Sequence, residues 1–213
     1  MPKPRKFPAL QAILDVDAAA NAGWNAPDLA AAFLDSGATF IQLRAKQLPS
    51  GTFLQLCDQV VRAAASYAAT VIVNDRVDLA MMSGAHGVHV GQDDLAPATA
   101  RDLLGVDRIV GYSTHTLAQV RAALDEPVSY VAVGPVFGTT SKVTGYDAVG
   151  LELVAEASRL ARGLPVVAIG GITLDTAPAV LAAGASCVAV IGDLVAGGDP
   201  RGRITAYRRA LGL

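Results

Sequence analysis

Short apolar segments, rich in β-branched residues, recur along the chain and alternate with longer stretches that contain more polar positions. Strands that are apolar at nearly every position are buried on both faces, as in parallel sheets covered by helices. Eight segments of this kind are predicted to be β-strands, at residues 9–14, 38–43, 70–74, 87–90, 108–111, 129–134, 165–170 and 187–192.

Alanine- and leucine-rich stretches with the period of an α-helix lie between these segments, and several of them end at a glycine. The predicted helices include residues 26–37, 48–67, 96–105, 116–124, 151–161 and 176–184. No linker or low-complexity stretch interrupts the series. The pattern therefore predicts an α/β fold, a single (β/α)8 TIM barrel domain over residues 1–213.

The amino-acid composition limits the classes of partner and the location that the protein can have. A net charge of -2 provides no broad basic surface, so we expect no nucleic acid partner. Every apolar run is shorter than the roughly 18 residues of a membrane span. The basic N-terminus precedes an apolar stretch that Asp15 and Asp17 interrupt, which disfavours a signal peptide. We expect a cytoplasmic protein with no membrane partner, in which Cys57 and Cys187 are reduced core residues.

In such barrels the chemistry lies at the carboxyl ends of the strands. The second strand ends in a segment whose period of two places Gln42, Arg44 and Lys46 on one face and Leu43 on the other. Two cations at the barrel mouth are costly unless an anion meets them, so the segment indicates a phosphate or diphosphate clamp. A solvated strand end is the alternative.

Carboxylates follow the next two strands. Asn74 and Asp75 end the third strand, and Asp93 and Asp94 come shortly after the fourth. Magnesium takes one or two protein carboxylates and completes its shell with water and phosphate oxygens. Asp75 and Asp94 are therefore a candidate magnesium site, whereas capping of the next helix by Asp93 or Asp94 is the alternative.

Hydroxyl groups follow the fifth and sixth strands. Ser113 could bind phosphate or belong to the cap of a helix that begins near Leu117. The three histidines lack the spacing of a zinc site, and His89 could be a hydrogen-bonded interior residue. The segment 134–142 carries three hydroxyls and a lysine, which favours a binding loop over a simple connector, and residues 138–146 are a candidate lid.

Glycine follows both of the last strands, at Gly170 and Gly171 and again at Gly192. Barrels commonly bind phosphate after strands seven and eight, where glycine lets a ligand approach the backbone amides. A pair of tight turns is the alternative, which the coincidence at both strands disfavours.

Six segments occur in order from about residue 38 onward: QLRAK, VNDRVDLA, GVHVGQDDL, GYSTH, GPVFGTTSK and AIGGI. Together they resemble the thiamine phosphate synthase family. The resemblance implies that a pyrimidine diphosphate, bound with magnesium, loses diphosphate to form a stabilised carbocation. The nitrogen of a thiazole phosphate then captures the carbocation to give thiamine phosphate.

The resemblance also implies roles for individual residues. The pyrimidine diphosphate would contact Gln42, Arg44, Lys46, Asn74, Ser113 and Lys142. One magnesium ion would bind Asp75 and Asp94. The thiazole phosphate would contact Thr139, Ser141, Gly171, Ile191 and Gly192. Arg44, Ser113 and Lys142 would be the catalytic residues, and the partners would be these two small molecules, with a homodimer left open.

The chain departs from the family at several positions. Ser141 stands where the family usually has threonine, Gly138 where proline is common, and Gly192 where a serine often supports the thiazole phosphate. The first strand, near residues 9–24, matches poorly. Without a hydroxyl at position 192, phosphate binding either weakens or shifts to backbone amides.

Two other functions remain open. One is a thiazole tautomerase-like paralogue, against which Asp75, Asp94 and the segment from Gln42 to Lys46 argue. The other is a barrel that binds thiamine precursors without catalysis, for which the same anion sites would suffice. Diphosphate release distinguishes these functions from a synthase.

Overall fold

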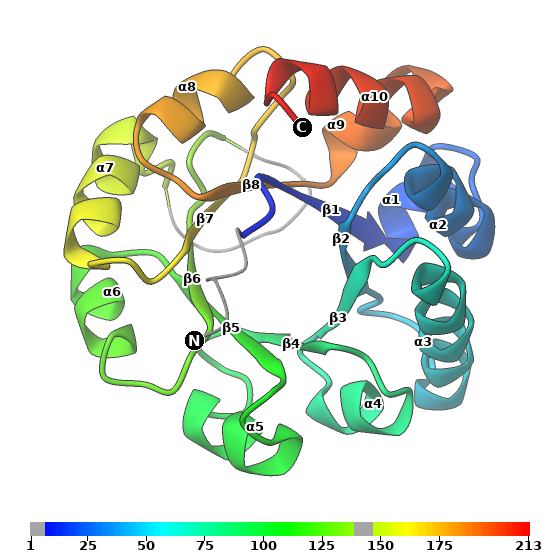
Figure 1. Cartoon of the computed structure of the whole chain (residues 1–213), viewed down its shortest axis with the longest axis horizontal. Coiled ribbons are helices and arrows are strands. Elements are labelled where there is room, and N and C mark those ends of the chain that lie inside the picture. Colours follow the sequence, from blue (N-terminus) through cyan, green and yellow to red (C-terminus); the bar gives the residue numbers. More distant parts are fainter. Residues whose placement is uncertain (1–6, 139–146) are drawn as a thin grey trace.

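The computed structural model describes residues 7–138 and 147–213, in which eight parallel strands close into a barrel ringed by helices (Figure 1). The strands are β1 Leu10–Asp15, β2 Phe40–Arg44, β3 Thr70–Asn74, β4 Gly87–Val90, β5 Ile109–Thr114, β6 Tyr130–Val133, β7 Val166–Ile169 and β8 Cys187–Val190. Each falls within or next to a predicted segment. The predicted TIM barrel is therefore confirmed.

Helices fill the connections between the strands. They are α1 Val16–Asn21, α2 Ala26–Asp35, α3 Ser50–Ala65, α4 Val77–Met82, α5 Pro97–Leu104, α6 Leu117–Ala123, α7 Gly150–Leu160, α8 Ala177–Ala182, α9 Gly192–Val195 and α10 Pro200–Ala210, with a 3-10 turn η1 at Ala196–Gly198. The six predicted helices correspond to α2, α3, α5, α6, α7 and α8. The sequence prediction did not include α1, α4, α9 or α10.

Pairing of the first strand with the last closes the barrel, since Leu10 lies opposite Val188 and Ala12 opposite Val190. Side chains alternate between two environments. Ile13 belongs to a small cluster inside the barrel, whereas its neighbour Leu14 packs in the large core between the strands and the helices. Both faces of the sheet are thus buried, as the apolar strand segments predict.

Aromatic rings fill the end of the barrel where the strands begin. Phe7 precedes β1, and its ring lies 5.5 Å from the rings of Phe40 and Tyr130. Gly111 on β5 leaves room for Tyr130, because a Cβ atom there would lie 2.1 Å from the tyrosine ring. This end is packed with side chains, so a ligand has to enter from the opposite end.

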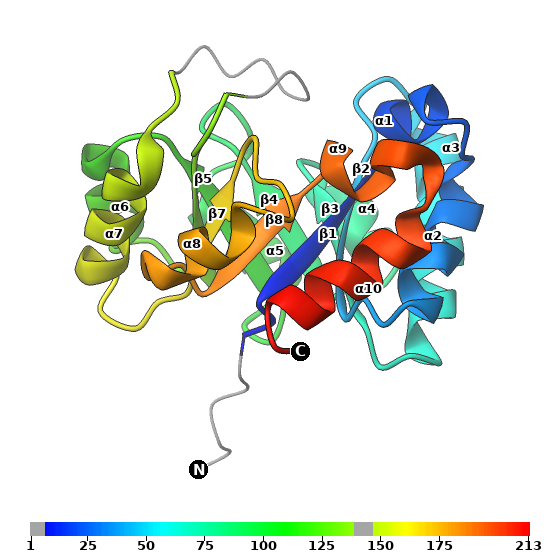
Figure 2. The same ribbon diagram turned by 90° about the horizontal axis from the view of Figure 1, so that it is seen from above.

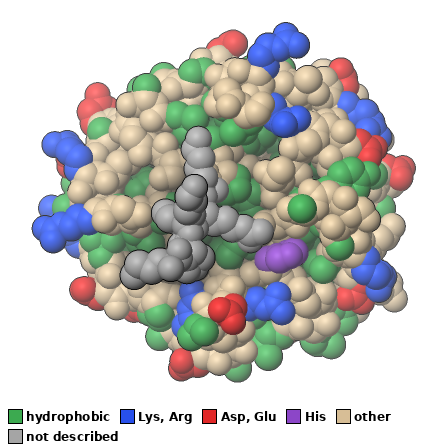
Figure 3. Space-filling model, viewed as in Figure 1, with side chains coloured by type: hydrophobic (Ala, Val, Ile, Leu, Met, Phe, Trp, Pro, Cys, Tyr) green, Lys and Arg blue, Asp and Glu red, His purple; other side chains and the backbone are tan. Residues whose placement is uncertain are grey.

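Figure 2 shows α9 on the side of the barrel where the strands end and the C-terminus of the chain on the other side. On the face drawn in Figure 3, acidic and basic side chains alternate around the margin, without a continuous basic surface. Cys57 and Cys187 are buried free thiols, as predicted. In the described part of the chain, no helix is long and apolar enough to cross a membrane.

Candidate active site

A cavity of about 360 Å³ lies at the carboxyl ends of the strands. Every strand contributes to its wall, and the contributing strand residues include Ile13, Gln42, Arg44, Asn74, His89, Ser113, Ala132, Ile169 and Ala189. The wall is therefore apolar on the β1, β6, β7 and β8 side and polar from β2 to β5. Such a cavity suits a ligand with one charged and one less polar part.

The polar side begins at β2, where Gln42 and Arg44 line the cavity, as the period of two predicts. Arg44 forms an ion pair with Asp15 at the end of β1, and the two side chains are only 11% and 6% exposed. The same carboxylate caps α1 by accepting a hydrogen bond of 2.8 Å from the amide of Ala18. The cation at the barrel mouth thus has a protein anion as its partner, which the sequence did not indicate.

Lys46 lies two residues beyond the end of β2 and is not part of the cavity wall. It forms an ion pair with Asp75, which follows β3. Asp75 has a φ of 64°, a left-handed conformation that is unusual for a residue other than glycine, and its amide donates a 2.7 Å hydrogen bond to the carbonyl of His89. That bond holds the loop after β3 against β4.

The carboxyl group of Asp94 interacts with that of Asp75, so adjacent strands do bring the two predicted metal ligands together. Partial burial, and then the neighbouring carboxylate, raise the pKa of Asp94. Asp94 also accepts a 2.7 Å hydrogen bond from the amide of Gly91. The alternative that an aspartate caps the next helix is wrong, since the N-cap of α5 is Ala96 and it makes no side-chain hydrogen bond.

A hydrogen-bonded chain crosses the polar side of the cavity. Ser113 lies 2.8 Å from one ring nitrogen of His89, and the hydroxyl of Tyr130 lies 2.8 Å from the other. His89 is therefore the interior histidine that the sequence suggested, and it orients Ser113 toward the cavity. Ser113 does not cap the next helix, because Thr116 is the N-cap of α6 and accepts from Gln119.

The other side of the cavity is built from backbone after β7 and β8. Gly170 and Gly171 have φ angles of 102° and 63°, and a Cβ on Gly171 would lie 2.4 Å from the carbonyl oxygen of Gly138. Ile191 and Gly192 line the same region at the start of α9. Glycine at positions 170, 171 and 192 leaves backbone without a side chain at this part of the cavity wall.

Three predicted residues, Thr139, Ser141 and Lys142, lie outside the described residues, as does most of the candidate lid. The described start of their loop does reach the cavity through Gly134, Pro135 and Gly138. Among the described residues, no group of three or more histidine, cysteine or acidic side chains could hold a metal ion. The pair of Asp75 and Asp94 would therefore need ligand oxygens to complete a metal shell.

The sequence interpretation gave no role to Asp15, Tyr130 or Asp193. Asp15 is the polar residue that ends an otherwise largely apolar strand. A polar residue at a strand end is a signal of function in a barrel, and it could have identified Asp15. Asp193 follows the last strand in the same way. Tyr130 carries no such signal, because it begins its strand and reaches His89 only through the barrel interior.

The arrangement was compared with known proteins. The family model described as thiamine monophosphate synthase matches residues 12–194. The chain belongs to this family. Membership in the thiamine monophosphate synthase family makes it a transferase of thiamine biosynthesis, as the resemblance implied.

Individual relatives agree with the family match. A thiamine-phosphate synthase of Anaeromyxobacter dehalogenans is 47% identical over 171 residues, which cover 80% of this chain and 76% of the relative. Another, of Koribacter versatilis, is 40% identical and covers 97% of both chains. A solved thiamine phosphate pyrophosphorylase from Pyrococcus furiosus superposes with a TM-score of 0.86 at 28% identity, over 96% of this chain and 95% of that one.

Proposed function

We propose that this member of the thiamine monophosphate synthase family joins a hydroxymethylpyrimidine diphosphate to a thiazole phosphate and releases diphosphate. One observation carries the proposal: Arg44 lines the cavity at the end of β2, with the ion pair of Lys46 and Asp75 beyond its wall, and glycine backbone lines the cavity after β7 and β8. Two separate anion sites on one cavity suit two phosphorylated substrates that meet between them.

The pyrimidine diphosphate would occupy the polar side. Gln42 and Asn74 are both buried and line the cavity, so they can hydrogen-bond the pyrimidine edge. Arg44, Lys46 and Ser113 would bind the diphosphate, together with Lys142. For Arg44 and Lys46, the incoming diphosphate would take over the role that the carboxylates of Asp15 and Asp75 play in the structure.

Magnesium fits the carboxylates that would hold it. Asp75 lies close enough to Asp94 to raise the pKa of the Asp94 carboxyl group, and a divalent cation between the two would relieve that repulsion. One ion held by these two residues would draw its remaining ligands from water and the diphosphate. When bound, it would stabilise negative charge on the leaving group.

The thiazole phosphate would occupy the other side. Backbone amides at Gly171, Ile191 and Gly192 would bind its phosphate, with the hydroxyls of Thr139 and Ser141. Because position 192 is a glycine, we favour binding through amides there over binding through a side chain.

The reaction asks little of a general base. The bond between the pyrimidine methylene carbon and the diphosphate oxygen breaks, and both of its electrons leave with diphosphate. The carbocation that remains takes an electron pair from the thiazole ring nitrogen. The protein has to hold both partners in line and neutralise charge on the leaving group, which Arg44, Lys46 and Lys142 would do.

The test is release of diphosphate by the purified protein given both substrates, with and without magnesium. A synthase releases diphosphate and forms thiamine phosphate only when magnesium is present. Binding of both substrates without release would indicate a non-catalytic barrel, and conversion of the thiazole alone would indicate a tautomerase. Lys142→Ala should abolish most of the turnover, whereas Thr139→Ala should mainly raise the KM for thiazole phosphate.

Two further properties accompany the proposal. We expect the protein in the cytoplasm, where its substrates would be made. The sequence leaves a homodimer open, and the mass of the protein in solution, measured by light scattering, decides this. Neither outcome alters the proposed reaction.

A further inference from the structure

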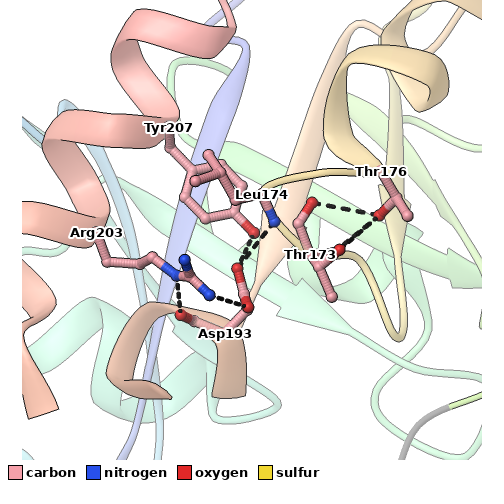
Figure 4. A network of polar contacts seen from close by, with 6 residues as sticks. All are labelled: Thr173, Leu174, Thr176, Asp193, Arg203 and Tyr207. Carbon is pink, nitrogen blue, oxygen red and sulfur yellow. Dashed lines mark hydrogen bonds and ion pairs between the residues drawn. The ribbon is translucent and has the colours of Figure 1, made fainter. Parts of the chain in front are cut away.

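A network of polar contacts joins the two backbone loops of the phosphate side to the last helix (Figure 4). Its centre is Asp193, the second residue of α9. One oxygen of its carboxylate accepts hydrogen bonds from the amide of Leu174, at 2.9 Å, and from the hydroxyl of Tyr207, at 2.6 Å. The other oxygen pairs with Arg203 at 2.7 Å.

The network is well shielded from solvent. The side chain of Asp193 is 12% exposed and that of Arg203 31%, and Tyr207 is fully buried. Arg203 makes a second contact, a 2.9 Å hydrogen bond from Nε to the backbone carbonyl of Asp193. Hydrogen bonds between charged groups are stronger than neutral ones, so Arg203 fixes both the side chain and the backbone of this residue.

The bond to Leu174 reaches across to a different loop. Leu174 lies after β7, in the segment that follows Gly171, and Thr173 beside it is fixed by a 2.9 Å hydrogen bond from its amide to the hydroxyl of Thr176. The loop after β7 is thus held by its own turn on one side and by Asp193 on the other, as Figure 4 shows.

Both loops line the cavity, and Asp193 itself belongs to the cavity wall. An aspartate so close to a phosphate site would repel the ligand if its charge were not compensated. Arg203 supplies that compensation from α10, a helix that contributes no residue to the cavity wall. The pair therefore orders the two loops without leaving a net negative charge beside the ligand.

We propose that Asp193 is a positioning residue for the thiazole phosphate, which holds the loops after β7 and β8 at the spacing that the phosphate needs, and that Arg203 and Tyr207 keep it in place. This inference rests on the proposed function. It assigns a role to residues of α9 and α10 that lie outside the reacting groups.

The first test is Asp193→Asn, which keeps the size of the side chain but loses its charge and one acceptor oxygen. The KM for thiazole phosphate should rise about tenfold, the effect of losing one hydrogen bond to a charged group. The KM for the pyrimidine diphosphate and kcat should change by less than about twofold, because that substrate lies on the other side of the cavity.

Arg203→Gln tests the charge. It leaves the carboxylate of Asp193 uncompensated beside the phosphate, so the KM for thiazole phosphate should rise more than in Asp193→Asn. The excess should shrink as salt is added, since ions screen the repulsion. An excess that does not respond to salt would contradict the compensating role of Arg203.

Asp199→Asn is the matched control. Asp199 caps α10 by accepting a 2.9 Å hydrogen bond from the amide of Gly202 and forms no part of the cavity wall. This variant makes the same chemical change at the start of the helix that carries Arg203 and Tyr207, and asparagine still caps a helix, so the melting temperature and both KM values should stay nearly unchanged. A rise in the thiazole KM equal to that of Asp193→Asn would show that loss of an aspartate charge near α10 is sufficient and would overturn the inference.

The outcomes separate the two proposals. If the wild-type protein releases no diphosphate, the proposed function fails. If the wild type is active but Asp193→Asn leaves the thiazole KM unchanged, or raises both KM values equally, only the positioning role fails. Should Asp193→Asn not fold, Tyr207→Phe removes one hydrogen bond and keeps the packing, and it should raise the same KM two- to threefold; no rise would overturn the role.

Discussion

At the scale of single residues, the two described cations of the candidate site each have a carboxylate partner. Arg44 is paired with Asp15, and Lys46 with Asp75. A cation buried without a partner costs several kcal/mol, so the pair with Asp15 lets the barrel keep Arg44 buried, whereas Lys46 is 44% exposed and needs its partner less. The carboxylates then determine how strongly the site holds an anion.

Asp15→Asn tests this arrangement. Asparagine still accepts the hydrogen bond that caps α1, but it leaves Arg44 without a counter-charge. We expect a loss of about 2 kcal/mol in the free energy of unfolding, and a smaller loss when inorganic diphosphate pairs with Arg44 in place of the carboxylate. Urea unfolding with and without diphosphate measures both.

Asp17→Asn is the control, because Asp17 is exposed two residues further along α1. It should change stability by less than about 0.5 kcal/mol. An equal loss for Asp15→Asn in the two conditions would mean that diphosphate does not reach Arg44.

The carboxylate pair predicts a dependence on pH. Since the pKa of Asp94 is raised in the folded protein, the folded state binds this proton more readily than the unfolded state. Protonation of Asp94 therefore favours the folded state. Without metal, the contribution of this residue to stability should increase as the pH falls through the raised pKa toward the ordinary one.

Magnesium should act in the opposite direction, because in the proposed site it would bind the ionised pair. We expect the magnesium concentration for half-maximal activity to rise as the pH falls, and Asp94→Asn to lose the pH-dependent part of the stability. Melting curves from pH 7 to pH 4, with and without magnesium, check both. A wild-type stability profile that coincides with that of Asp94→Asn would contradict the interaction between the carboxylates.

At the scale of elements, the loops after β6 and β7 approach each other closely at a glycine. Gly170 has a φ of 102°, and a Cβ there would lie 2.5 Å from the Cα of Pro135. Gly105, which ends α5, has a φ of 83° but no atom within 4 Å of such a Cβ. Both positions have a positive φ, and they differ in the space around the glycine.

Gly105→Ala should therefore cost about 2 kcal/mol, for the backbone conformation alone, because a positive φ with a ψ of 169° is adopted almost only by glycine. Gly170→Ala should cost about 3 kcal/mol or more, because the loops after β6 and β7 have to separate as well. Urea denaturation of both variants measures the difference. Equal losses would show that the loops separate freely and that the close approach is not needed.

The elements also show which parts of the fold a sequence can predict. The strands could be found because both of their faces are buried and nearly every position is apolar. The helices α1 and α4 have six residues each, a length at which a helical period is a weak signal, although α8 has the same length and was predicted. In α10 only Pro200, Ile204 and Tyr207 are buried, so its polar sequence resembles a surface segment.

At the scale of the whole molecule, the parts of the site that escaped prediction are contacts across barrel connections. The lysine and carboxylates were predicted at neighbouring strand ends because parallel strands all end on one side of the barrel. Which carboxylate pairs with which cation depends on side-chain directions after closure. Asp15 and Arg44 are 29 positions apart, as are Lys46 and Asp75, and no local pattern relates them.

The two ends of the barrel contribute differently: one end is packed with side chains, and the other holds the cavity. Phe7 tests whether a change at the packed end affects stability but not activity. Its ring packs on Phe40 and Tyr130 at the end where the strands begin, and it contributes nothing to the cavity wall. Phe7→Ala should lower the free energy of unfolding by about 2 kcal/mol, less than for a fully buried phenylalanine because Phe7 is half-buried. At temperatures where the variant is folded, kcat and both KM values should stay within about twofold of the wild type.

Ser113→Ala, at the other end, should reverse the pattern. Removing the hydroxyl leaves no large void, so the loss in the free energy of unfolding should be about 1 kcal/mol. Loss of the proposed diphosphate contact should lower kcat/KM for the pyrimidine diphosphate at least tenfold. Tyr130 connects the two ends, since it packs against Phe7 and hydrogen-bonds His89. If Phe7→Ala lowers kcat as much as Ser113→Ala does, packing at the closed end controls the position of His89, and the two ends of this barrel act as one unit.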